Sequence, residues 1–106
     1  MIKVIIKQDN QEIVYVHVTG HANSNEHGKD LVCAGVSAIC VGIANQLVNM
    51  GFMNDLGTIQ LSEGNFKIKV NQSSHDIQLV LETFETMMKT LEETYDQYIK
   101  IMKTEV

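Results

Sequence analysis

The chain of 106 residues has no Pro, no Trp and no Arg, and it holds only two Cys. Because Arg is absent, the bidentate contacts by which many proteins read bases and phosphates are excluded. Eight Lys stand against thirteen Asp and Glu, which gives a formal net charge of −5. These counts leave no basic patch for a nucleic acid, so we expect no direct nucleic-acid partner.

A long apolar run is another feature that we expect to be absent. No run approaches the roughly 20 residues that a membrane span needs, so we expect no membrane partner. The N-terminal MIKVIIKQDN lacks a small-residue cleavage site and is not typical of a signal peptide. We therefore expect a cytoplasmic protein, made of one domain over residues 1–106, in a compartment where thiols stay reduced.

Two hairpins are indicated by short β-branched runs separated by turn residues. Residues 2–7 and 12–19 flank a polar turn and predict the first hairpin. Residues 57–62 and 65–71 flank Glu63-Gly64 and predict the second. In the last of these runs, apolar and polar residues alternate, which is typical of a sheet with one face in water.

Two segments carry apolar residues at helical spacing. The first predicts a helix over 31–49, with Asp30 as its N-cap. The second predicts a helix over 75–102, capped by Ser73 or Ser74 and roughly 40 Å long at 1.5 Å per residue. A helix of that length would overhang the sheet or meet a partner. The order ββαββα predicts an α+β fold of two layers, in which a mostly antiparallel four-stranded sheet is covered by two helices.

Cys33 is the first candidate for chemistry. It is expected in the first turn of the 31–49 helix, where unpaired amides carry partial positive charge and favour a thiolate. A helical side chain points back toward the helix N-terminus, so the sulfur should face the polar loop 21–30. That loop contains His21 and His27. A His beside such a Cys can form the thiolate–imidazolium pair of cysteine hydrolases.

Several neighbours could support this chemistry. The backbone amides of Leu31, Val32, Cys33 and Ala34, in the expected first turn, are candidate donors to an oxyanion. Asp30 could orient His21 in addition to capping the helix. Ser37 lies one helical turn beyond the cysteine and can reach the thiol or a substrate, although it can also bond back to its own helix.

A structural role is the alternative for each of these polar residues. Cys33 could equally be a small buried hydrophobe, which is a frequent role of cysteine outside disulfides. Cys40 lies in mid-helix on the apolar stripe and is expected in the core. Seven helical residues separate the two thiols by about 10 Å, so they cannot form a disulfide. His17 in a strand and His75 at a helix start are expected to be structural.

A zinc site is a second interpretation of the same loop. His21, His27, Asp30 and Cys33 are all possible ligands. Their spacing matches no familiar pattern, and only one Cys lies within reach. We therefore expect no metal and no cofactor.

A small binding or assembly module without catalysis is the third interpretation. Gly35, Ala38 and Gly42 flatten one side of the first helix, so a neighbour could approach it closely. Gly inside a helix costs up to about 1 kcal/mol, so some contact is expected to compensate.

The chain resembles the ribosomal-processing cysteine proteases called Prp, whose members look like GHA, then G-x-D-x-VCA-G-x-SA. The resemblance lies in two separated blocks, each with a residue type of catalytic use. The matching positions are Gly20, His21, Ala22, Gly28, Asp30, Val32, Cys33, Ala34, Gly35, Val36, Ser37 and Ala38.

The resemblance implies an endopeptidase that removes a short N-terminal extension from a bacterial large-subunit ribosomal protein, the one that reaches the peptidyl-transferase centre. This removal would be needed before the ribosome can work. Carried over residue by residue, Cys33 is the nucleophile, His21 is the general base, and Asp30 and Ser37 have supporting roles. The family also implies a homodimer.

The loop between the two catalytic candidates is expected to act as a gate over the bound peptide. It has almost nothing to bury, so little offsets the entropy of ordering it. Its residues are Ala22, Asn23, Ser24, Asn25, Glu26, His27, Gly28 and Lys29.

Overall fold

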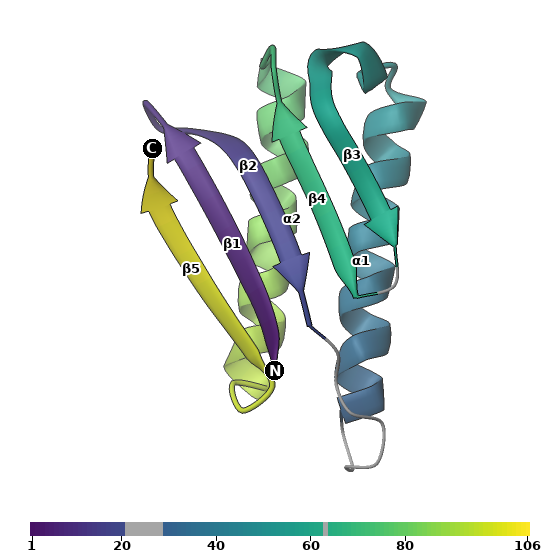
Figure 1. Ribbon diagram of the computed structural model, residues 1–106, viewed down its shortest axis with the longest axis vertical. Coiled ribbons are helices and arrows are strands. Elements are labelled where there is room, and N and C mark those ends of the chain that lie inside the picture. Colours follow the sequence, from purple (N-terminus) through teal and green to yellow (C-terminus); the bar gives the residue numbers. More distant parts are fainter. Residues whose placement is uncertain (21–28, 63) are drawn as a thin grey trace.

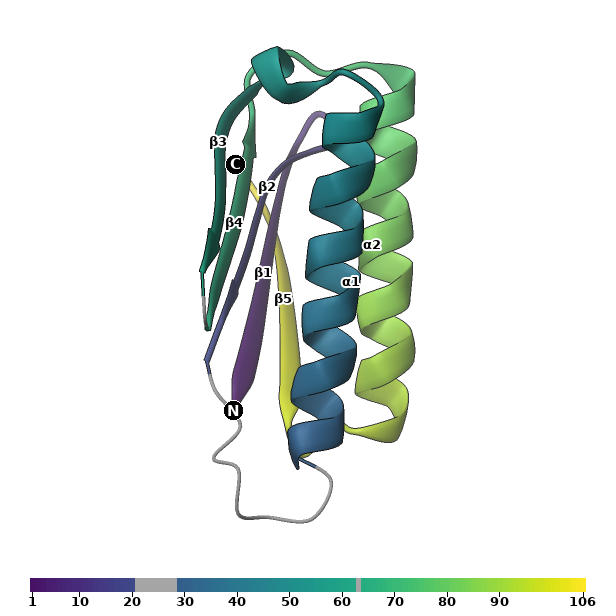
Figure 2. The same ribbon diagram turned by 90° about the vertical axis from the view of Figure 1, so that its right-hand side faces the viewer.

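The computed structural model describes residues 1–20, 29–62 and 64–106, with Lys29 and Asp30 described by their backbone alone. The chain is a five-stranded sheet in the order β3-β4-β2-β1-β5, with two long helices on one of its faces (Figures 1 and 2). The predicted two-layer α+β architecture is therefore confirmed. The elements are β1 (Ile2–Asp9), β2 (Glu12–Thr19), α1 (Lys29–Asn49), the 3₁₀ turn η1 (Met53–Asp55), β3 (Leu56–Ser62), β4 (Asn65–Val70), α2 (His75–Thr94) and β5 (Ile99–Glu105).

The first hairpin closes through a two-residue turn whose backbone is left-handed. Asn10 and Gln11 have φ of 53° and 70°, the conformation that matches the twist of the flanking strands. The register of the β1–β2 pair shifts once along the hairpin. This bulge buries both Ile13 and Val16, which strict alternation along 12–19 would have placed on opposite faces.

The prediction of four strands and of a helix over 75–102 was wrong. Helix α2 ends at Thr94, and the chain turns back to form a fifth strand. β5 pairs in parallel with β1, from Ile99 opposite Ile2 to Glu105 opposite Gln8. The sheet is mostly antiparallel, as predicted, with one parallel pair, and no overhanging helix remains in the described chain.

The reason for this error is local. Tyr95, Tyr98 and Met102 continue the spacing of the helical stripe, and neither Gly nor Pro marks the break. The strand has one buried residue, Ile99, so its own pattern is weak. It forms because β1 offers a row of backbone partners, beginning with the Ile2 N–H that donates to the Tyr98 carbonyl at 2.8 Å. Only the tertiary structure supplies that edge.

The two helix starts differ in how well they were predicted. Ser74 caps α2, because its hydroxyl accepts from the Ile77 amide at 3.3 Å. Helix α1 begins at Lys29, so Asp30 lies inside its first turn and is not the N-cap. Cys33 therefore lies in the second turn of α1 and not in the first.

Helix α1 also corrects the expectation that no apolar run approaches a membrane span. The stretch Leu31–Asn49, 19 residues long, is long and apolar enough to cross a membrane by length and composition. In this fold one side of it packs under the sheet and beside α2 (Figure 2). The core helix of a two-layer domain can have the same length and the same apolar composition as a membrane span.

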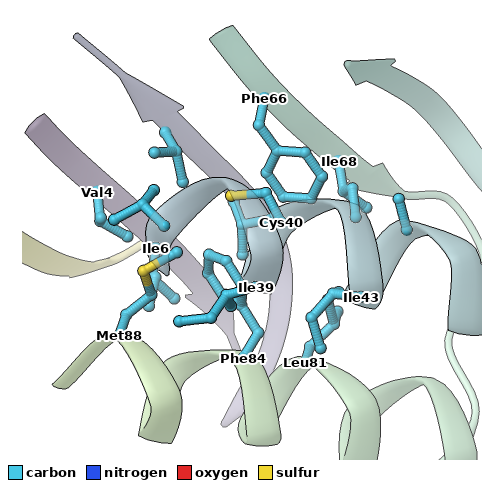
Figure 3. Packing of buried hydrophobic residues seen from close by; sticks show 14 of the residues in the cluster. Val4, Ile6, Ile39, Cys40, Ile43, Phe66, Ile68, Leu81, Phe84 and Met88 are labelled. Atoms are coloured by element: carbon cyan, nitrogen blue, oxygen red, sulfur yellow. The ribbon is translucent and has the colours of Figure 1, made fainter. Parts of the chain in front are cut away.

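The core lies between the sheet and the helices (Figure 3). Phe66 of β4 and Phe84 of α2 meet there with ring centroids 6.0 Å apart. Burial of each such side chain contributes roughly 1.5–3 kcal/mol. The largest fully buried side chains are Phe84, Ile2, Ile6, Leu47, Ile68, Ile77, Leu81, Met88, Ile99, Val4, Val16 and Val32.

A nearly buried carboxylate of α2 contributes to holding strand β5 in place. Glu85 of α2 forms ion pairs with Lys89 at 2.9 Å and with Lys103 of β5 at 3.1 Å. Burial alone would raise the pKa of Glu85, but the hydrogen bonds and charges of the two Lys lower that pKa below its ordinary value of 4.5. Ionised Glu85 therefore stabilises the docking of β5.

We predict that Glu85→Gln lowers the free energy of unfolding at pH 7 by roughly 1–3 kcal/mol, because the charge-assisted bonds are lost. A group whose folded pKa is lowered stabilises the fold above its ordinary pKa, and this contribution disappears as pH falls through the folded value. Urea denaturation should therefore separate wild type from variant at pH 7 and not near pH 2. Glu82→Gln, on the exposed side of α2, is the control and should change little. Equal loss in both variants would contradict the role of Glu85.

Candidate active site

A cavity of about 340 Å³ opens between the N-terminal half of α1 and the adjacent ends of four strands, β1 to β4. Cys33 and Ser37 of α1 form part of one wall. Gly20, at the end of β2, and the second hairpin form the other. The lining residues are Ile2, Val18, Gly20, Cys33, Val36, Ser37, Cys40, Val41, Leu61, Ser62, Gly64, Asn65 and Phe66.

The two polar residues of α1 lie where a substrate in the cavity could touch them. Cys33 is half-buried and packs against the core. Ser37 follows one turn later on the same wall and is exposed. Ser37 thus lines the same cavity as Cys33, and its role stays a prediction.

Gly20 fixes the point where the chain leaves β2. Its φ is 108°, and a Cβ there would lie 2.3 Å from the carbonyl oxygen of Met1 and 3.2 Å from Cα of Ile2. No side chain fits in that space, and an L-residue would also be strained. The Gly20 N–H donates to the Gly64 carbonyl at 3.2 Å. Gly20, the last described residue of this segment, therefore belongs to the wall of the Cys33 cavity.

Several predicted site residues lie outside the described residues. These are His21 and the expected gate from Ala22 to Gly28, together with the side chains of Lys29 and Asp30. The gate and the orienting role of Asp30 stay predictions. The zinc interpretation depends on the same residues. Among the residues that are described, no cluster of three or more His, Cys, Asp or Glu could hold a metal.

The start of α1 also bears on the oxyanion donors. The first four amides of a helix have no carbonyl partner inside it. With α1 beginning at Lys29, these amides, counted from the position before Lys29, end at Leu31. The amides of Val32, Cys33 and Ala34 lie further along, where helical amides donate to carbonyls four residues earlier. Of the four predicted donors, helix geometry therefore favours the Leu31 amide, and the oxyanion role stays a prediction.

The two cysteines have different surroundings on the same helix. Cys40 is almost fully buried beside Phe66, at the inner side of the cavity (Figure 3). Burial raises the pKa of the Cys40 thiol to about 12, because the thiolate would lose its hydration. The prediction that Cys40 is a core residue is confirmed.

The other histidines in the described part of the chain have surroundings that fit structural roles. The ring of His17 lies 2.7 Å from the Asn65 side-chain oxygen and links β2 to β4. His75 is exposed at the start of α2, 3.4 Å from Asp76. Neither His lines the cavity.

The contribution of the second hairpin to the site was missed. Leu61, Ser62, Gly64 and Asn65 line the cavity, although 28 or more residues separate them from Cys33. The turn signal at Glu63-Gly64 predicts a hairpin and gives no information about what its tip approaches. Only the pairing of β4 with β2 places that tip beside Gly20.

We predict that Cys33 is alkylated near neutral pH at least tenfold faster than Cys40, whose burial and raised pKa suppress the thiolate. Peptide mapping by mass spectrometry after brief iodoacetamide treatment measures both sites in one sample. Labelling in urea is the control and should make the two rates similar. Equal labelling of both sites in the folded protein would contradict the prediction.

Comparison with known proteins identifies the family of the chain. A model of the family described as cysteine protease Prp matches residues 1–100. The ribosomal processing cysteine protease Prp of Staphylococcus aureus is 32% identical over 100 residues, which cover 92% of each chain. The protein of the same name from Bacillus subtilis is 31% identical over 107 residues, covering 95% of this chain and 96% of that one.

Solved structures with the same fold include complexes. Prp from S. aureus with a substrate peptide superimposes with a TM-score of 0.84 at 29% identity, covering 97% of this chain and 99% of the other. The same protein with a covalently linked product peptide gives 0.81 at 30% identity, with the same coverage. Both similarities extend over nearly the entire chain and include the cavity-lining elements.

Proposed function

The chain belongs to the cysteine protease Prp family, and we propose that it removes the N-terminal extension of a bacterial large-subunit ribosomal protein, the one that reaches the peptidyl-transferase centre. The observation that carries this proposal is the shared cavity wall. Cys33 lines the cavity, and Gly20, which immediately precedes His21 in the chain, lines it too. A nucleophile and a general base can therefore meet over one bound peptide.

The mechanism follows from these two groups. His21 accepts the proton of the Cys33 thiol, and the thiolate attacks the carbonyl carbon of the scissile peptide bond. His21 then gives the proton to the leaving amine, and a thioester remains on Cys33. Water, deprotonated by His21, hydrolyses the thioester and restores the thiol. The covalently linked product peptide of the S. aureus protein supports such a covalent route.

Three neighbours would assist. The Leu31 amide, at the positive end of α1, donates to the oxyanion that develops during the attack. Asp30 orients the imidazole of His21, and Ser37 binds the substrate backbone one turn beyond Cys33. We place this reaction in the cytoplasm, where ribosomes are assembled and thiols are reduced.

We predict that Cys33→Ala abolishes cleavage of the extended ribosomal precursor, and that His21→Ala slows it by at least about 10²-fold, as for a lost general base. Mass spectrometry of the purified precursor with each enzyme gives the rates and the cleavage position. Circular dichroism should show both variants folded.

Two results would contradict this assignment. Full activity of Cys33→Ala would remove the protease mechanism. Activity that a chelator abolishes and zinc restores would favour the metal interpretation instead. Activity in the presence of a chelator, with no gain from added zinc, is the result expected for a thiol protease.

We also propose a homodimer, formed through the exposed side of α1. Leu31, Val41 and Val48 are exposed apolar residues that lie within an arc of about 100° on the outer side of α1 and form a broad stripe, of which Val41 also lines the cavity. Gly42 lies at the edge of this stripe, and nothing lies within 4 Å of where its Cβ would be. Gly35 was predicted to belong to this flattened side, but it faces Leu91 of α2 and is explained by helix packing within the chain.

We predict a dimer at micromolar concentrations in sedimentation equilibrium. Val48→Lys should shift it toward monomer, because two charges would meet across a two-fold axis. Met53→Lys is the matched control, since Met53 is equally apolar and exposed but lies in η1, outside the stripe. A wild-type monomer at these concentrations would remove the dimer and leave the catalytic assignment intact.

A further inference from the structure

Strand β3 is an open edge of the sheet that leads into the Cys33 cavity. It is the first strand in the sheet order, and within the described chain no strand pairs with its outer side. Its last residues, Leu61 and Ser62, line the same cavity as Cys33. Figure 1 shows β3 running antiparallel to α1, toward the N-terminal half of that helix.

The register of the second hairpin shows which backbone groups face outward. Ser62 is opposite Asn65 and Gln60 is opposite Lys67. In a two-residue hairpin the residues that flank the turn exchange both hydrogen bonds, and the pattern repeats every second residue. The N–H and C=O groups of Ile59 and Leu61 therefore point to the open side of the sheet.

The opposite edge of the sheet is protected by charges. On β5 the Ile101 amide donates to the Glu92 carboxylate at 2.9 Å. This backbone N–H is therefore already bonded to a side chain and is not available to another strand. The strand carries Lys100 and Lys103, and Lys103 is ion-paired with Glu85. Charged side chains and capped backbone groups prevent an edge from pairing with another chain.

None of these protections is present on β3 within the described residues. Its sequence, LGTIQLS, has no charged residue and no Pro. Leu61 is 48% exposed beside the cavity. An uncharged strand edge is a template for pairing with an extended chain. Of the two edges of the sheet, only β3, the edge that leads to Cys33, therefore offers such a template.

We propose that the substrate peptide binds as an additional strand along the outer side of β3, and that this pairing carries the scissile bond to Cys33. The proposal rests on the proposed function and names how that site holds its substrate. Backbone hydrogen bonds from Ile59 and Leu61 align an extended peptide, while the cavity receives its side chains. β3 is thus a positioning element of the protease.

The test compares two substitutions at one position. Leu61→Pro removes the outward N–H together with the Leu side chain, whereas Leu61→Ala removes most of the side chain and keeps the N–H. Proline is tolerated on the open side of an edge strand, because the ladder to β4 is unaffected. With a synthetic peptide that spans the cleavage site of the ribosomal precursor, kcat/KM of Leu61→Pro should be about five- to tenfold below that of Leu61→Ala, mostly through KM.

A second measurement uses the wild-type enzyme and needs no variant to fold. N-methylation of the peptide, one residue at a time, removes one backbone donor per peptide. Pairing with an edge predicts losses of kcat/KM at every second residue on the side that contacts β3, with residues between them little affected. Losses without this period, or none, would overturn the proposal.

The other outcomes distinguish a failure of the edge pairing from a failure of the proposed function. Equal kcat/KM for Leu61→Pro and Leu61→Ala, with normal cleavage by wild type, overturns the edge pairing and leaves the proposed function. No cleavage by wild type overturns both. A dimer that dissociates in Leu61→Pro and not in Leu61→Ala assigns the edge to a second copy of the chain and overturns the proposal.

Discussion

The close approach of Gly20 to the backbone of Met1 and Ile2 fixes the end of β2 at the wall of the cavity that Cys33 lines. A Cβ at Gly20 would lie 2.3 Å from the Met1 carbonyl oxygen, so the end of β2 can pack there only without a side chain. The same residue donates its N–H to Gly64, which fixes the tip of the second hairpin beside it. The wall of the cavity opposite Cys33 depends on both contacts.

Behind this wall, the core makes the position of α1 rigid. Val32, Val36 and Cys40 are buried on one side of the helix, and Cys33 and Ser37 lie beside that side at the cavity. Two cysteines seven residues apart thereby acquire different chemistry. The thiol of Cys40 is buried and its pKa is raised, whereas the thiol of Cys33 lines the cavity. Burial, and not residue type, makes this distinction.

The two edges of the sheet have opposite properties for a physical reason. β5 is the last element of the chain and is stabilised by side chains of α2, through Glu85 and Glu92. Those same carboxylates and the Lys of β5 prevent further pairing. β3 is held by β4 on one side, and within the described residues no strand pairs with its other side, which leads to the cavity that Cys33 lines. A protease that must accept an extended peptide gains from such an asymmetric sheet.

The sequence alone determined the two hairpins, the first helix to within two residues and the cap of α2, because turn residues and apolar periodicity act locally. The blocks around His21 and Cys33 also determined the family, since their residue types and spacing are specific. β5 was decided by the tertiary structure, because a strand with one buried residue forms only where β1 supplies backbone partners. The same holds for the cavity wall at Leu61 and Asn65, which reaches Cys33 only through strand pairing. Local patterns specify elements, while contacts between distant strands arise from the packing of the complete sheet against both helices.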